Sequence, residues 1–230
     1  MLNVSVFSFL FPVHFLFPIS SAFLSFYLYF KIVFLGQAEK RTNPLHVAAK
    51  KGDIEVIKLV LPYYEIDSLN ESGQTPLMLA AAVGNKAAFQ MLMQNHANTR
   101  LKCPLGDCLL HFAAEGGNKH ILTDVLSLNL DVNQRNHAGI TPLATAALWG
   151  NQGAFDLLLK NKANEFLISK YGYSVLHFAA FAGIVPIIRE LISRGLDPNL
   201  EDRSGSTPLI TATQESKSEA VEYLLSIGAR

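Results

Sequence analysis

Three histidines and two cysteines are the residues of this sequence that first suggest a metal site or proton transfer. His46, His111 and His177 each close a similar four-residue string, and Cys103 and Cys108 form a single C-x4-C pair. This pair predicts two free thiols in a reducing compartment, or a disulfide if the chain is secreted. A zinc site made of four cysteines is excluded, and the phosphate-loop, nucleophile-elbow and H-E-x-x-H motifs are absent. We therefore predict no catalytic residue, no metal site and no cofactor.

The overall charge balance excludes one class of partner. The 230 residues carry 19 Lys and Arg against 19 Asp and Glu, and only 17% of residues are charged. Proteins that bind nucleic acid normally have a basic excess. We therefore expect a protein partner and no nucleic acid.

The first 35 residues differ from the remainder. They contain one charged residue, Lys31, and 11 of the 23 aromatic residues, whereas residues 36–230 carry all 19 acidic side chains. Residues 1–38 therefore form a separate hydrophobic segment, which is long enough to cross a bilayer. Three interpretations remain open: a transmembrane helix over roughly residues 19–35, a cleaved signal peptide, or an extension that is not part of the folded protein. If the segment spans a membrane, the basic residues that follow it place the C-terminal part in the cytoplasm.

The rest of the chain is an internal repeat. Similar strings such as Thr75-Pro76-Leu77-Met78 and Thr141-Pro142-Leu143-Ala144 recur, with their leucines at 45, 77, 110, 143, 176 and 209. A pair of alanines and a glycine follow in most copies. This pattern resembles the ankyrin repeat, whose signature T-P-L-H-x-A has a period of 33 residues. The resemblance covers residues 39–230 as six repeats that start near 41, 73, 106, 139, 172 and 205.

The local chemistry of one repeat predicts two helices. Thr75 can cap a helix that has proline at its first position, and Gly84 can end that helix in the left-handed conformation. Phe89 and Leu92 then lie at helical spacing in a second helix. The resemblance implies an all-α solenoid of helix-turn-helix pairs with β-hairpin fingers, in which each repeat is stabilised by stacking on its neighbours.

The resemblance also implies roles for individual residues. It gives the three histidines a structural role, in hydrogen bonds to backbone near the fingers. Asn133 and Asn199 occupy the position that asparaginyl hydroxylases modify in similar repeats, although such asparagines also order the loop.

The resembled family binds proteins through finger tips and the inner face of the first helix of each repeat. At these positions the fourth and fifth repeats are unusually apolar, which is typical of an interface rich in hot spots. An alternative is that Trp149 and Phe181 pack between repeats as local core. The predicted partner-binding residues are Ile140, Leu148, Trp149, Tyr171, Tyr173 and Phe181.

The function expected from these features is a non-catalytic scaffold or adaptor, monomeric and cytoplasmic. One alternative is an adaptor that residues 1–35 tether to a membrane. Another is the targeting part of a larger protein, possibly an enzyme or a channel, because the last helix carries Val221, Leu224 and Leu225 with no polar closing repeat after it.

Overall fold

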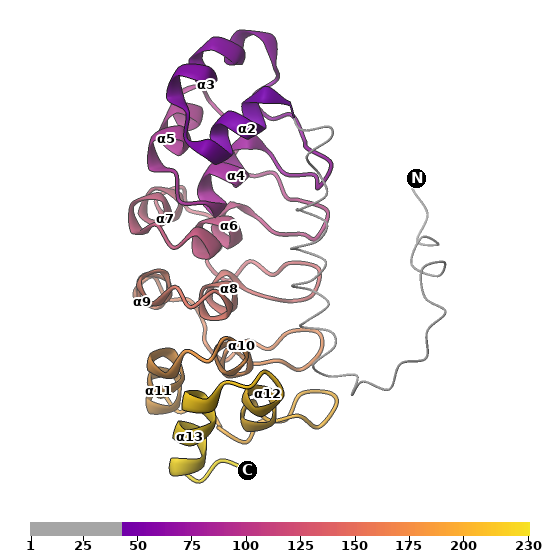
Figure 1. Ribbon diagram of the computed structural model, residues 1–230, viewed down its shortest axis with the longest axis vertical. Coiled ribbons are helices and arrows are strands. Elements are labelled where there is room, and N and C mark those ends of the chain that lie inside the picture. Colours follow the sequence, from indigo (N-terminus) through magenta and orange to yellow (C-terminus); the bar gives the residue numbers. More distant parts are fainter. Residues whose placement is uncertain (1–42) are drawn as a thin grey trace, which may run out of the picture.

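The computed structural model describes residues 43–230, and the predictions made for residues 1–38 lie outside this range. The chain forms successive pairs of antiparallel helices, in which a first, inner helix is followed by a second, outer helix (Figure 1). The inner helices are α2 (Pro44–Lys51), α4 (Pro76–Ala82), α6 (Leu109–Gly116), α8 (Pro142–Leu148), α10 (Val175–Ala182) and α12 (Pro208–Gln214). The outer helices are α3 (Ile54–Val60), extended by the 3₁₀ turn η3 (Leu61–Tyr63), α5 (Lys86–Gln94), α7 (Lys119–Leu126), α9 (Gln152–Lys160), α11 (Val185–Ser193) and α13 (Ser218–Ser226).

Each inner helix begins and ends where its sequence predicts. The Thr75 hydroxyl accepts a hydrogen bond from the Met78 N–H, and Pro76 occupies the first helical position. Gly84 follows the helix with a φ of +72°, a left-handed conformation that glycine adopts without steric cost.

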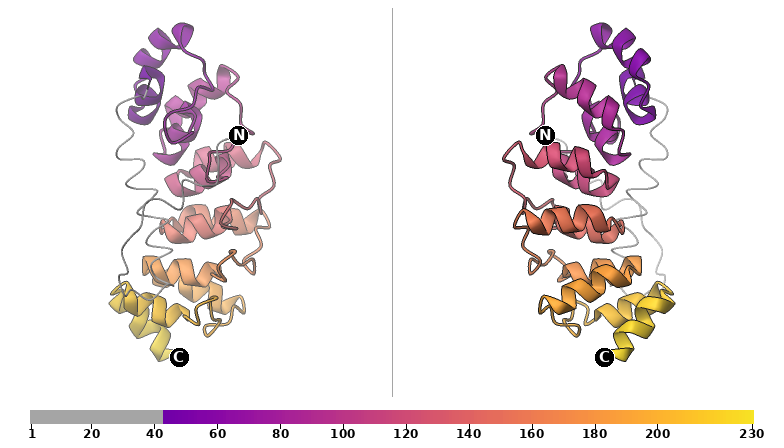
Figure 2. Two further views of the ribbon diagram at one scale, coloured as in Figure 1. Left: turned by 90° about the vertical axis from the view of Figure 1, so that its right-hand side faces the viewer. Right: turned by 90° about the vertical axis from the view of Figure 1, so that its left-hand side faces the viewer.

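The helix pairs stack in successive levels along the long axis of the molecule (Figure 2). Two adjacent alanines are buried in every inner helix except α12, which has Ala212 alone, and they let neighbouring inner helices approach closely. Between the inner and outer layers lies a continuous core, whose largest fully buried side chains include Phe89, Phe112, Phe155 and Phe178. The stacking expected from the resemblance is therefore what buries the apolar surface.

From α4 onward, the turn before each inner helix projects to the side opposite the outer helices, and we call it the finger of that helix (Figure 1). In the α8 finger (136–140) the Asn136 N–H donates to the Ile140 carbonyl, and the Gly139 N–H donates to the Asn136 carbonyl. The other fingers are 70–74 before α4, 103–107 before α6, 169–173 before α10 and 202–206 before α12.

The expected β-hairpins are not formed as strands. Residues 43–230 contain no β-strand, and their only ladder element is an isolated antiparallel bridge between Lys102 and Cys108. Two backbone bonds close each finger tip, and these are too few to make a hairpin ladder. The all-α part of the prediction is confirmed, and the fingers are tight turns.

Asparagine side chains join successive repeats at a position that sequence reasoning missed. The Asn85 amide donates to the Lys50 carbonyl, Asn118 to the Gly84 carbonyl, and Asn151 to the Ala114 carbonyl. Each asparagine thus satisfies a carbonyl at, or just after, the C-terminal end of the preceding inner helix. The recurring Gly-Asn pair in the sequence was the signal for this contact.

Candidate partner-binding surface

The three motif histidines are buried bridges between repeats. In each ring Nε2 lies close to a backbone carbonyl. The distance is 3.0 Å from His46 to Gln74, 3.0 Å from His111 to Ile140, and 3.1 Å from His177 to Ser206. Each acceptor belongs to the finger of the next repeat. This confirms the structural role, because each ring holds two adjacent repeats together.

The other ring nitrogen of His177 faces the start of its own helix. The Ser174 N–H donates to Nδ1 over 3.1 Å, so this nitrogen acts as an acceptor and the ring is neutral. Burial disfavours the charged ring and lowers the pKa of His177.

The cysteines are two buried thiols that form no disulfide with each other. Cys108 occupies the capping position of α6, and its Sγ lies 3.1 Å from Nδ1 of His111. Burial is the largest single influence and opposes ionisation of the thiol, but the hydrogen bond to His111, the charge of that ring and hydrogen bonds from backbone N–H groups together lower the pKa of Cys108. Burial likewise opposes a charge on His111, yet the Cys108 contact and the charge of Asp107 raise the pKa of that ring. The pair replaces the serine–histidine contact seen in α10 and caps the helix.

The expected exposure of the apolar patch is confirmed for two of its six residues. Trp149, which follows α8, is 38% exposed, and Tyr171 at the tip of the α10 finger is 36% exposed. Phe181, near the end of α10, is half-buried and packs partly against the core. These side chains lie on the surface formed by the finger tips and the C-terminal ends of the inner helices, which we call the finger face.

Exposure was wrongly expected for Ile140, Leu148 and Tyr173, which are buried. The position after the finger glycine is buried in every described finger; its residues are Gln74, Asp107, Ile140, Tyr173 and Ser206.

Tyr173 shows the physical reason why this position is buried. Its ring contacts His177 and Phe178 edge to face, and its hydroxyl hydrogen bonds to the Asp202 carboxylate in the next finger. Burial and this carboxylate raise the pKa of Tyr173 well above its usual value. The side chain therefore stabilises the junction between two repeats and does not face a partner.

Backbone hydrogen bonds connect three junctions between fingers. The N–H groups of His137, Lys170 and Arg203 donate to the carbonyls of Leu105, Ala138 and Tyr171, over 2.9, 2.9 and 3.0 Å. These bonds fix the position of each finger tip relative to the one before it.

The junction between the α4 and α6 fingers lacks this bond. Its donor position is Pro104, which has no N–H. The proline ring instead lies against Gly73, where an added Cβ would come within 2.3 Å of it. The sequence contains the signal for this irregularity, because proline occupies the position of His137 in the preceding finger.

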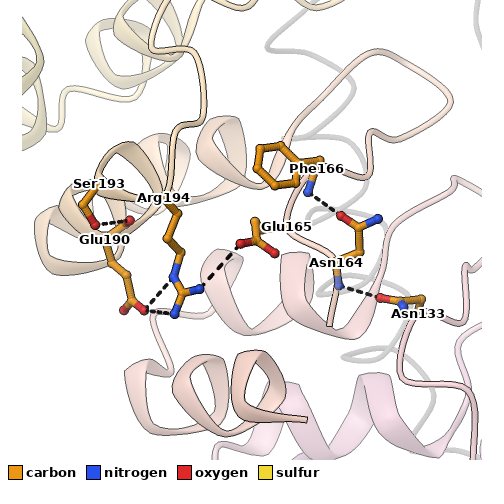
Figure 3. Close-up of polar contacts among 7 residues, drawn as sticks. All are labelled: Asn133, Asn164, Glu165, Phe166, Glu190, Ser193 and Arg194. Atoms are coloured by element: carbon orange, nitrogen blue, oxygen red, sulfur yellow. Dashed lines mark hydrogen bonds and ion pairs between the residues drawn. The ribbon is translucent and has the colours of Figure 1, made fainter. Parts of the chain in front are cut away.

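The two asparagines predicted as hydroxylation sites order the loops between repeats, and Figure 3 shows the contact of Asn133. The Asn133 side-chain oxygen accepts a hydrogen bond from the Asn164 N–H over 2.8 Å, and that of Asn199 accepts one from the Arg230 N–H over 2.7 Å. In the same region Arg194 pairs with Glu190 over 3.0 Å and lies 3.6 Å from Glu165.

A family model described as ankyrin repeats (3 copies) matches residues 27–103, 78–166 and 161–230. The chain belongs to the ankyrin-repeat family. Ankyrin-repeat domains are typically non-catalytic modules that bind proteins, so a protein partner is the general expectation for this array.

Several curated proteins resemble this ankyrin-repeat chain. It is 30% identical over 198 residues to human transient receptor potential cation channel subfamily A member 1. The aligned region covers 81% of this chain and 18% of the channel. Identity to mouse Rabankyrin-5 is 30% over 162 residues, 69% of this chain and 14% of that protein. Identity to the mouse B-cell lymphoma 3 protein homolog is 26% over 217 residues, 76% of this chain and 48% of that protein. The chain thus spans less than half of each of these relatives.

Two further observations concern the described ankyrin repeats. Among residues 43–230 no helix has the length and apolar character needed to cross a membrane. In the same range no group of three or more His, Cys, Asp or Glu residues could hold a metal ion. The prediction of a membrane segment in residues 1–35 lies outside the described residues.

Proposed function

We propose that this chain is a non-catalytic scaffold of six ankyrin repeats, starting near 41, 73, 106, 139, 172 and 205, that binds a protein partner through its finger face. The observation that supports this proposal is the exposure of Trp149 and Tyr171 on adjacent repeats. Aromatic side chains supply much of the affinity of protein interfaces. Here they belong to elements whose positions are fixed by the core and by the backbone hydrogen bonds between fingers. We place the main contact on α8, α10 and the α10 finger.

A comparative pull-down tests this proposal. The wild-type chain, Trp149→Ala and Tyr171→Ala serve as baits, and quantitative mass spectrometry compares the recovered proteins. We expect a set of partners whose affinity falls about 30-fold in each variant, which corresponds to about 2 kcal/mol for a hot spot.

Phe166→Ala is the matched control. Phe166 is 60% exposed, but it lies in the loop that precedes the α10 finger, at the position of Asn133 in the repeat before. This variant should recover the wild-type partners. Equal recovery by all four baits would refute the proposed surface.

A membrane-tethered adaptor is the second candidate. It is favoured by the apolar composition of residues 1–35 and by the similarity to a cation channel. The test is the distribution of a green-fluorescent fusion with and without residues 1–35. Membrane fluorescence that depends on this segment supports tethering, and an even cytoplasmic distribution of both fusions supports a cytoplasmic scaffold.

We also infer that Asn133 and Asn199 are substrates of asparaginyl hydroxylation. Both side chains are held by a hydrogen bond from the following repeat, so an enzyme would reach them when the loop opens. Peptide mass spectrometry of the protein isolated from animal cells should find one added oxygen atom on each asparagine. Unmodified peptides at both positions would contradict this inference.

A further inference from the structure

Basic side chains occupy the same position in three successive finger tips. His137, Lys170 and Arg203 each follow the first residue of their finger, and all three side chains are exposed. Their own N–H groups make the hydrogen bonds that join the fingers. The row is therefore held in register by the backbone, and we call it the basic rim.

No acidic side chain among residues 43–230 forms an ion pair with the basic rim. Among residues 43–230, Lys170 and Arg203 form no ion pair. His137 lies 3.1 Å from the Pro104 carbonyl, a neutral group. Arg135, beside the same finger, donates to the Gly139 and Ile168 carbonyls, which are also neutral. An anionic ligand could thus approach Lys170 and Arg203 without first breaking an ion pair.

Two acidic residues affect this charge, Asp202 in the α12 finger and Glu201 directly before it. Asp202 is buried, and one of its oxygens accepts hydrogen bonds from the Ser204 and Ser206 N–H groups. Glu201 is exposed and weakens the positive potential at the last finger. The basic character is therefore strongest at the α8 and α10 fingers, next to the exposed aromatic residues.

The helix ends of the finger face are apolar at this level. Trp149 follows α8 and Phe181 lies near the end of α10, whereas the corresponding parts of α6 and α12 carry Glu115 and Glu215. We call the surface formed by Trp149 and Phe181 the aromatic floor. On the finger face it lies next to the basic rim and between the acidic positions Glu115 and Glu215.

We propose that the basic rim and the aromatic floor together bind a short acidic segment of a partner protein, with an aromatic or aliphatic side chain on Trp149 and Phe181 and carboxylates facing Lys170 and Arg203. This proposal rests on the proposed function and names the chemistry of the partner. Complementary charge at a rim speeds association and excludes wrong partners, while the apolar anchor supplies most of the affinity.

A single-stranded nucleic acid would also offer negative charge and rings that stack. It carries a phosphate at every nucleotide, however, and would meet Glu115, Glu201 and Glu215 on the same surface. A peptide can place its carboxylates at the rim and leave these positions neutral. The zero net charge of the chain also argues for the peptide.

Selection of random peptides displayed on phage tests the proposal, with the full chain as bait. We expect enriched peptides that combine an aromatic or aliphatic residue with an excess of Asp and Glu. A fluorescent copy of the most enriched peptide should bind about tenfold more weakly to the Lys170→Glu/Arg203→Glu variant, and more weakly as salt rises, because rim charges are screened.

The control variant Lys119→Glu/Lys160→Glu makes the same charge change on the outer helices α7 and α9 and should bind like the wild type. Enriched peptides that require Trp149 but carry no acidic excess would overturn the acidic-segment proposal and leave the proposed function standing. Enriched peptides that bind Trp149→Ala as tightly as the wild type would instead overturn the proposed function. Tighter binding of labelled oligothymidylate than of the peptide, lost in Lys170→Glu/Arg203→Glu, would assign the rim to nucleic acid and refute the proposal.

Discussion

At the scale of single residues, the same side chain often serves two repeats. His177 accepts a hydrogen bond from the cap of its own helix and bonds the finger carbonyl of the next repeat at Ser206. Burial makes such a contact valuable, because a carbonyl left without a partner in the interior costs free energy. The residues that look most reactive in the sequence are thus used for stacking.

Replacement of His177 tests this contact. His177→Ala leaves the buried Ser206 carbonyl without this donor, and we expect the free energy of unfolding to fall by about 2 kcal/mol. Urea denaturation followed by circular dichroism measures the change. His120→Ala, on an exposed part of α7, is the control and should change stability by less than about 0.5 kcal/mol. Equal stability of the two variants would contradict the bridging role.

The lowered pKa of His177 predicts a pH dependence. An unfolded histidine has a pKa of about 6.5, and burial holds the folded value below this. As the pH falls through this window the unfolded state binds a proton that the folded state does not, so stability decreases with acidification. Urea denaturation at pH 7.5 and 5.5 should show a smaller loss in His177→Ala than in the wild type. The same loss in both would show that another group carries the dependence.

At the scale of elements, helix ends were predictable and side-chain direction in the fingers was not. Thr75, Pro76 and Gly84 determine a helix through local bonds and backbone angles, which depend on residue type alone. The position of Tyr173, in contrast, depends on where the next finger lies, and that contact forms only when repeats stack. A polar residue or a tyrosine at this position gives no local sign that it is buried.

Substitution of two glycines distinguishes the free-energy cost of backbone strain from the cost of disturbing the contact between fingers. Gly172 in the α10 finger and Gly195 after α11 have φ values of +86° and +91°. A Cβ at Gly172 would lie 2.7 Å from the Arg203 backbone nitrogen, whereas a Cβ at Gly195 would meet nothing within 4 Å. Gly195→Ala should cost about 1 kcal/mol, from the left-handed conformation alone. Gly172→Ala should cost about 3 kcal/mol, because the adjacent fingers must also separate. Thermal or urea unfolding measures both, and equal losses would argue against tight finger packing.

At the scale of the whole molecule, each helix pair packs mainly against the pairs directly before and after it. Stability is then close to a sum of repeat and junction contributions, so the array need not unfold in one step. The periodic sequence predicted this stacking. Differences between junctions, such as the missing finger bond at Pro104, were harder to predict because a single residue removes a bond within an otherwise regular pattern.

Two leucines at the same position of their outer helices test this independence. Leu158 in α9 and Leu224 in α13 are both fully buried, so replacement by alanine should cost about 2–5 kcal/mol locally in each. The single tryptophan, Trp149, follows α8 and reports on the centre of the array, whereas circular dichroism reports on all helices. Leu158→Ala should lower the urea midpoint seen by both probes. In Leu224→Ala the circular dichroism signal should begin to fall at a lower urea concentration than in the wild type. The tryptophan transition should stay near its wild-type midpoint, because the repeat of α12 and α13 can unfold without the centre. Equal shifts of both probes in Leu224→Ala would show that the described repeats unfold as one cooperative unit.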